Sequence, residues 1–168
     1  VDFGANVGGF TDCLLQAGAR KVYAVDTGYG ELAWTLRRDD RVIVMERTNA
    51  LHAARPEAVN LAVIDVAFTP QRLAVPAAGR WLARDGSIIS LLKPHYEIAK
   101  RCGRRPAGPL AFSDAAETCL SVTRELEADG WNVRAVMLSP LRGKGGNVEF
   151  LLHVAPAVSA NSPSCVRS

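Results

Sequence analysis

The chain opens with a short apolar segment that runs directly into a glycine-rich turn and then into a helical pattern. Val1–Gly4 is expected to form a strand, and Gly8–Ala17 a helix that stops at Gly18. In a strand–turn–helix unit the helix has to bury its apolar stripe against a sheet. Along the rest of the chain, short apolar runs alternate with helical patterns. The opening therefore favours an α/β domain with a mainly parallel sheet.

The alternation of apolar runs and helical patterns continues to the end of the domain. Further strands are predicted at Lys21–Asp26, Arg41–Met45, Asn60–Val66, Gly86–Leu92, Trp131–Leu138 and Asn147–Val154. Further helices are predicted at Gly30–Arg38, Pro70–Ala83 and Ser113–Asp129, the last with Ser113 as its N-cap. Tyr96–Phe112 contains two glycines and two prolines and is predicted to be a loop.

The last two predicted strands are joined by Ser139–Gly146, a segment too short for a crossover helix. Strands joined so tightly should be antiparallel neighbours. We therefore predict a seven-stranded, mostly parallel sheet with its last strand antiparallel and with helices on both faces, a Rossmann-like α/β fold.

Length and composition limit the kind of protein this chain belongs to. Its 168 residues suit one domain, which we assign to residues 1–154, followed by a disordered tail at 155–168 that is rich in Ser, Pro and Asn. Because a natural protein seldom begins inside a core strand, we expect that an N-terminal portion precedes Val1. No apolar run is long enough to span a bilayer, and the four cysteines lack metal-ligand spacing. These features predict a cytoplasmic protein with reduced thiols and no metal site.

The turn after the first strand is suited to holding a ligand. Gly4 permits a sharp turn and a close approach to the backbone, and the helix after the turn offers free N–H groups. A dinucleotide fingerprint would have glycine at Asn6, and an acid, Asp2, precedes the first glycine. The turn thus favours a ligand with an ammonium group, such as the amino acid end of S-adenosylmethionine. The candidate cofactor-binding residues here are Asp2, Gly4, Ala5, Asn6, Gly8, Gly9 and Phe10.

Polar residues also follow the second and third predicted strands. Asp26 lies about twenty residues past the glycine turn, where an acid suits a ribose diol, and Thr27 and Gly28 come next. Glu46 and Asn49 follow the third strand, where an adenine edge would lie. Since ligands in open α/β sheets gather at the carboxyl ends of the strands, we expect these groups to face one crevice.

A second set of polar residues lies in the later strands. Asp65, which is also a candidate cofactor-binding residue, ends a buried strand, Lys93 directly follows the next one, and Glu149 lies in the last. One interpretation is a structural Asp–Lys pair with a Glu on an edge strand. The other is catalytic: a lysine in a partly apolar cleft orients or deprotonates a hydroxyl nucleophile, and Asp65 and Glu149 fix that lysine.

Motifs along the chain resemble the TlyA (hemolysin A) family of ribosomal RNA 2′-O-methyltransferases. The resemblance covers residues 1 to about 154. It rests on Gly8–Gln16, Val22–Asp26, Gly28–Gly30 with Leu32–Trp34, Glu46–Asn49, Ile64–Phe68, Leu92–Pro94, Ser139–Pro140 and Gly146–Leu152. It implies an FtsJ-like class I methyltransferase fold, S-adenosylmethionine as the cofactor, and transfer of a methyl group to the ribose 2′-hydroxyl of a cytidine in ribosomal RNA, with ribosomal subunits as partners.

The resemblance also implies a Lys-Asp-Lys-Glu catalytic tetrad. Asp65, Lys93 and Glu149 match its last three members, while its first lysine and the family's S4-type RNA-binding domain would lie before Val1. The chain departs from the family at Asn6-Val7, where Ser-Thr is usual. It departs again at Arg104–Gly108, where a glycine-rich segment is usual.

Several alternatives remain open at this level. The basic run of Lys100, Arg101, Arg104 and Arg105 either contacts phosphates or is simply solvated. The domain as a whole could bind S-adenosylmethionine or RNA without catalysis, as a hemolysin-like protein, or could be a nucleotide-binding dehydrogenase. The sequence does not predict the oligomeric state.

Overall fold

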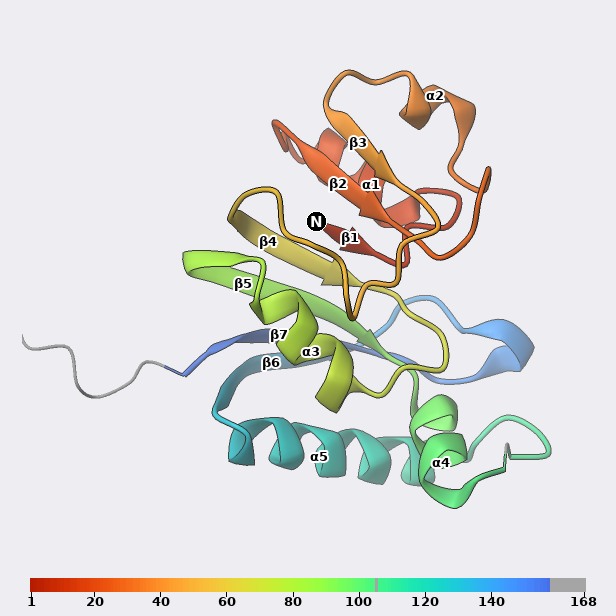
Figure 1. The fold of residues 1–168 in the computed structure, drawn as a ribbon. Coiled ribbons are helices and arrows are strands. Elements are labelled where there is room, and N and C mark those ends of the chain that lie inside the picture. Colours follow the sequence, from red (N-terminus) through yellow and green to blue (C-terminus); the bar gives the residue numbers. More distant parts are fainter. Residues whose placement is uncertain (105, 158–168) are drawn as a thin grey trace, which may run out of the picture.

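The fold is built on a central sheet of seven strands in a computed structural model that describes residues 1–104 and 106–157 (Figure 1). The strand order is β3-β2-β1-β4-β5-β7-β6. The strands are β1 (Asp2–Phe3), β2 (Val22–Val25), β3 (Val42–Met45), β4 (Val59–Ile64), β5 (Leu82–Leu92), β6 (Trp131–Leu138) and β7 (Phe150–Pro156).

Strands β1 to β5 are parallel, and β7 pairs antiparallel with both β5 and β6. The predicted fold class, a mostly parallel Rossmann-like sheet with its last strand reversed, is therefore confirmed. The helices are α1 (Gly9–Gln16), α2 (Trp34–Arg37), α3 (Gln71–Gly79), α4 (Pro94–Cys102) and α5 (Phe112–Ala128).

The helices cover both faces of the sheet and enclose two apolar clusters. Alternate residues of β2 show the division, because Tyr23 and Val25 belong to one cluster while Val22 and Ala24 belong to the other. The larger cluster lies under α3 and α5, and the smaller one lies under α1 and α2 (Figure 1).

Trp81 lies at the centre of the larger cluster, just before β5. It is 1% exposed, and its ring meets Phe3 at 5.6 Å and Tyr23 at 5.7 Å between centroids, both edge to face. The indole therefore packs against two neighbouring parallel strands, β1 and β2.

The segment predicted as a loop at Tyr96–Phe112 begins as helix α4, so the first part of that prediction is wrong. Pro94 occupies the first helical position, where its missing N–H is not needed. The helix ends only at Gly103, which has a φ of 71°. The remaining glycine and the prolines lie beyond that point, so the glycine and proline content of the whole segment concealed its helical start.

Other boundaries shift in smaller ways. Helix α2 has only four residues, since Gly30 has a φ of 78° and the chain becomes helical only at Trp34. Strand β5 begins at Leu82, earlier than predicted, and α3 is correspondingly shorter. Helix α5 has Ala111 rather than Ser113 as its N-cap.

At the end of the chain, β7 begins at Phe150 and continues to Pro156, so residues 155 and 156 belong to the sheet rather than to the predicted tail. The remainder of that tail, from residue 158, lies outside the described residues. Among the helices that the structure describes, none has the length and apolar character needed to span a membrane.

We predict that Trp81→Ala lowers the free energy of unfolding by about 3–5 kcal/mol, because it empties the centre of the larger cluster. The matched control is Trp34→Ala, since Trp34 is 70% exposed and should change that free energy by less than about 0.5 kcal/mol. Denaturant titration measures both. Equal effects of the two changes would contradict the placement of Trp81 in the core.

Candidate active site

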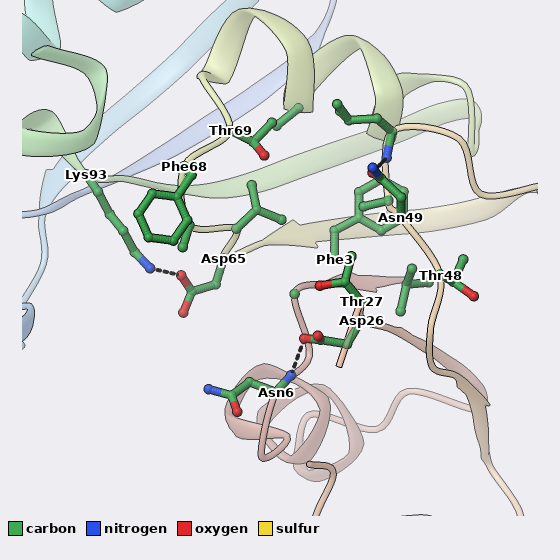
Figure 2. Close-up of a pocket in the computed structure, with 17 residues that line it drawn as sticks. Phe3, Asn6, Asp26, Thr27, Thr48, Asn49, Asp65, Phe68, Thr69 and Lys93 are labelled. Carbon is green, nitrogen blue, oxygen red and sulfur yellow. Dashed lines mark hydrogen bonds and ion pairs between the residues drawn. The ribbon is translucent and has the colours of Figure 1, made fainter. Parts of the chain in front are cut away.

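A cavity of about 430 Å³ opens where the five parallel strands end (Figure 2). Each of these strands contributes residues from the segment that follows it, which is the usual position of a ligand site in an open α/β sheet. The lining comprises Gly4 and Asn6 after β1, Asp26 and Thr27 after β2, Thr48, Asn49, Ala50 and Leu51 after β3, Asp65, Val66, Ala67, Phe68 and Thr69 after β4, and Lys93 after β5, together with Phe3, Val25 and Ala74.

The turn after β1 is shaped by Gly4, which has a φ of 86°. A Cβ at this position would overlap the backbone carbonyl oxygen of Asp65, so the chain after β1 passes directly against the end of β4. Both the backbone angle and the close approach require glycine here. This contact joins the glycine turn to the residue that carries the candidate catalytic carboxylate.

Asp26 is held by the same turn. Its Oδ2 accepts a hydrogen bond of 2.9 Å from the backbone N–H of Asn6, and its Oδ1 accepts one of 2.7 Å from the N–H of Gly28. The two bonds fix the plane of the carboxylate at the cavity wall (Figure 2). Each carboxylate oxygen retains a lone pair, so Asp26 can still accept hydrogen bonds from a diol.

The predicted cofactor residues around the turn fall into two groups. Gly4, Asn6, Asp26, Thr27, Asn49 and Asp65 line the cavity. The others are not part of the lining: Asp2, Ala5, Gly8, Gly9, Phe10, Gly28 and Glu46.

Asp2 is only 1% exposed, and its Oδ2 accepts a hydrogen bond of 2.7 Å from the Thr11 hydroxyl. Burial raises the pKa of Asp2 to about 6, although the Thr11 hydrogen bond opposes that rise. The carboxylate therefore lies beneath the glycine turn and braces α1 against β1, rather than facing the cavity as the sequence had indicated.

Glu46 does not line the cavity either. Its carboxylate forms an ion pair with Arg37 and accepts a hydrogen bond of 2.9 Å from the N–H of Gly30. It therefore ties the end of β3 to α2 and to the turn before it. Asn49 does line the cavity, and its Oδ1 accepts a hydrogen bond from the N–H of Leu51 that shapes the loop.

Of the three candidate catalytic residues, Asp65 and Lys93 line the cavity, while Glu149 does not line it but lies near enough to feel both charges. Lys93 forms an ion pair with Asp65, and its side chain is 17% exposed (Figure 2). Glu149 is 7% exposed, and burial raises its pKa, while the charge of Lys93 lowers it and that of Asp65 raises it further. The three charges are thus close enough to influence one another.

The glycine-containing turn before β7 closes over Glu149. A Cβ on Gly143 would overlap the Glu149 Oε1 atom, so this glycine gives the carboxylate its space. The turn is held by a hydrogen bond from the N–H of Gly143 to the carbonyl of Asn147, and by another from the N–H of Ser139 to the carbonyl of Glu149.

The segment after Asp65 is a part of the site that was not predicted from the sequence. Residues 66–69 line the cavity, and Phe68 is 58% exposed with a φ of 62°, which is unusual for a phenylalanine. Its ring lies 4.8 Å from that of Tyr96. The sequence feature that could have indicated this part of the site is the apolar stretch Val66-Ala67-Phe68, which continues past Asp65 at the end of the predicted strand.

The basic run is only partly available for a ligand. Arg101 forms an ion pair of 2.8 Å with Glu125 and also donates to the Ser121 hydroxyl. Lys100 and Arg104 are exposed, and Arg105 lies outside the described residues. Within residues 1–104 and 106–157, no group of three or more His, Cys, Asp or Glu side chains could hold a metal ion.

Comparison with known proteins places this site in a family context. A family model described as FtsJ-like methyltransferase matches residues 1–155. The 16S/23S rRNA (cytidine-2′-O)-methyltransferase TlyA of Mycobacterium tuberculosis H37Rv is 42% identical over 158 residues, which cover 90% of this chain and 58% of that protein. The chain therefore spans little more than half the length of this relative.

Two solved structures are also similar. A Streptococcus thermophilus structure described as a hemolysin is 37% identical, has a TM-score of 0.84, and is matched over 94% of this chain and 58% of that one. The N-methyltransferase NodS of Bradyrhizobium japonicum, in complex with S-adenosyl-L-homocysteine, has a TM-score of 0.63 and covers 92% of this chain and 76% of its own. It is only 16% identical, so it supports the fold alone.

We predict that Gly4→Ala lowers the free energy of unfolding by roughly 2–4 kcal/mol, because the methyl group needs a strained backbone angle and meets the Asp65 carbonyl. Gly9→Ala is the matched control, since nothing lies within 4 Å of a Cβ there, and it should change that free energy by less than about 1 kcal/mol. Thermal or denaturant unfolding distinguishes the two, and an unaffected Gly4→Ala protein would contradict the close approach of the turn to β4.

Proposed function

Because the chain belongs to the FtsJ-like methyltransferase family, we propose that it transfers a methyl group from S-adenosylmethionine to the ribose 2′-hydroxyl of a cytidine in ribosomal RNA. The similarity to TlyA supports this choice of acceptor, since the name of that relative specifies cytidine 2′-O-methylation of 16S and 23S rRNA. A ribosomal substrate would also place the protein in the cytoplasm.

The cavity residues fit the proposed cofactor. Asp26, oriented by two backbone N–H groups, would accept hydrogen bonds from the two ribose hydroxyls. Asn6 and the backbone after Gly4 would hold the methionine end, while Asn49 and Leu51 would lie along the adenine. The volume of about 430 Å³ falls in the usual range for small-molecule pockets.

The observation that carries the proposal is the Lys93–Asp65 ion pair, which lines the same cavity as Asp26 (Figure 2). S-adenosylmethionine supplies an electrophilic methyl group when it is bound. The Lys93 ammonium would orient the incoming 2′-hydroxyl, or would accept its proton after first giving up one of its own to solvent, and the carboxylates of Asp65 and Glu149 would hold the lysine Nζ in place. Because methyl transfer is an in-line displacement, this alignment supplies much of the rate.

We predict that Asp26→Ala weakens S-adenosylmethionine binding at least about tenfold, because a carboxylate that accepts two hydroxyl hydrogen bonds is lost. Isothermal titration calorimetry with S-adenosylmethionine measures the dissociation constant. Asp40→Ala is the control, since Asp40 is an exposed acid that does not line the cavity and should leave binding unchanged. Similar affinities for the two variants would argue against Asp26 as the ribose ligand.

We predict that Lys93→Ala lowers the rate of methyl transfer to ribosomal subunits roughly 100-fold or more while S-adenosylmethionine binding is largely retained. The assay uses tritiated S-adenosylmethionine and the full-length protein. Lys21→Ala is the matched control, because Lys21 precedes β2 at the opposite end of that strand and pairs with Glu57. A protein that binds the cofactor but methylates no ribosomal RNA would instead be a non-catalytic binding domain.

A further inference from the structure

We propose that Glu97 is a positioning residue for methyl transfer, because its buried carboxylate fastens the loop after Asp65 to the helix that begins directly after Lys93. This inference rests on the proposed function, since it concerns the alignment of the same catalytic lysine. Neither the sequence motifs nor the residues that line the cavity include Glu97.

The contact itself is a hydrogen bond between two buried groups. The Oε1 of Glu97 accepts a bond of 2.8 Å from the backbone N–H of Gln71, and the two residues are 6% and 3% exposed. Gln71 is the first residue of α3, so its N–H has no partner within the helix. Glu97 supplies the acceptor that this buried N–H needs, since an unsatisfied buried donor is costly.

On one side of this bond lies the loop that forms a wall of the cavity. The loop leaves β4 at Asp65 and passes Phe68 before it reaches α3 at Pro70 and Gln71. Because Phe68 has a positive φ, the surrounding structure must hold this loop in its observed path. The Glu97 carboxylate fixes the far end of the loop, and the end of β4 fixes the near end.

On the other side of the bond lies the start of α4. Lys93 is the N-cap of this helix, and its carbonyl accepts hydrogen bonds from the N–H groups of Tyr96 and Glu97. The backbone of Glu97 is thus one helical turn from that of Lys93. Its side chain anchors that turn to α3, while the Tyr96 ring packs against Phe68 of the loop. Lys93 and Asp65 are therefore held together directly by their ion pair and indirectly by the Glu97–Gln71 bond.

The side chain of Gln71 extends the same connection to the sheet. Its Oε1 accepts a hydrogen bond of 2.6 Å from the Ser90 hydroxyl, and its Nε2 donates one of 3.2 Å to the carbonyl of Leu91. Both partners lie in β5, shortly before Lys93. Burial raises the pKa of Glu97, and Arg101, Arg72 and Glu125 are the charged side chains that act on it.

The test compares Glu97→Leu, which removes the acceptor, with Glu97→Gln, whose side-chain carbonyl can still accept from Gln71. We expect Glu97→Leu to lower the single-turnover rate of RNA methylation by the full-length protein about tenfold, because a small displacement of Lys93 suffices. Its dissociation constant for S-adenosylmethionine should change less than about threefold, and Glu97→Gln should restore the rate to within about twofold of the wild type.

Thr123→Val is the matched control for a general loss of stability. Thr123 is also buried, and its hydroxyl donates a hydrogen bond of 2.9 Å to the Leu120 carbonyl within α5. This variant should methylate at the wild-type rate. The proposal is overturned if Glu97→Leu keeps the wild-type rate, if Glu97→Gln is as slow as Glu97→Leu, or if Thr123→Val is equally slow.

A second measurement does not depend on the proposed reaction. Backbone hydrogen exchange of the RNA-free protein should accelerate at residues 66–71 and 93–97 in Glu97→Leu, and remain unchanged there in Glu97→Gln and Thr123→Val. Unchanged exchange in Glu97→Leu would refute the anchoring role. If exchange accelerates in Glu97→Leu but the wild-type protein methylates no RNA, the proposed function is refuted and the anchoring contact is still supported.

Discussion

The Asp65–Lys93 ion pair is the interaction on which the rest of the site depends, and its geometry is set by the pairing of two neighbouring strands. Ile64 of β4 pairs with Ser90 of β5, so the residues that follow each strand emerge at the same edge of the sheet. Removing one partner of a buried pair leaves the other charge unpaired, which costs about 3–5 kcal/mol when burial is complete. The partly exposed position of this pair reduces that cost and leaves the lysine open to the cavity.

The glycine turn couples this pair to the cofactor side of the cavity. Gly4 passes so close to the carbonyl of Asp65 that no side chain fits between them, and the same turn presents the N–H of Asn6 to Asp26. A movement of the turn would therefore shift both the Asp26 carboxylate, which faces the proposed ribose, and the Asp65 carboxylate, which pairs with the proposed catalytic lysine. Backbone contact therefore links the proposed cofactor half of the site to the proposed catalytic half.

Much of this arrangement could be predicted from the sequence, because strand ends are local features. The apolar runs that end at Asp26, Asp65 and Lys93 located the strands, and the order of a parallel sheet brought their ends together. The sequence could not show that Glu46 and Asp2 do not line the cavity, because their partners, Arg37 and Thr11, are determined by how helices pack on the sheet. Helix α4 was missed because the glycines and prolines from Gly103 onward led all of Tyr96–Phe112 to be predicted as a loop.

The two halves of the site are stabilised by different means. The ends of β1, β2 and β4 are held by ladder hydrogen bonds on both sides, which fix Gly4, Asp26 and Asp65 through the backbone. Lys93 and the segment at 66–69 lie beyond the ladder, where such bonds no longer act. Because catalytic groups must be held within about 0.5 Å, side chains have to replace the missing backbone bonds there. The buried Glu97–Gln71–Ser90 network performs that task, and this explains why polar groups lie beneath a wall of the cavity that is otherwise apolar.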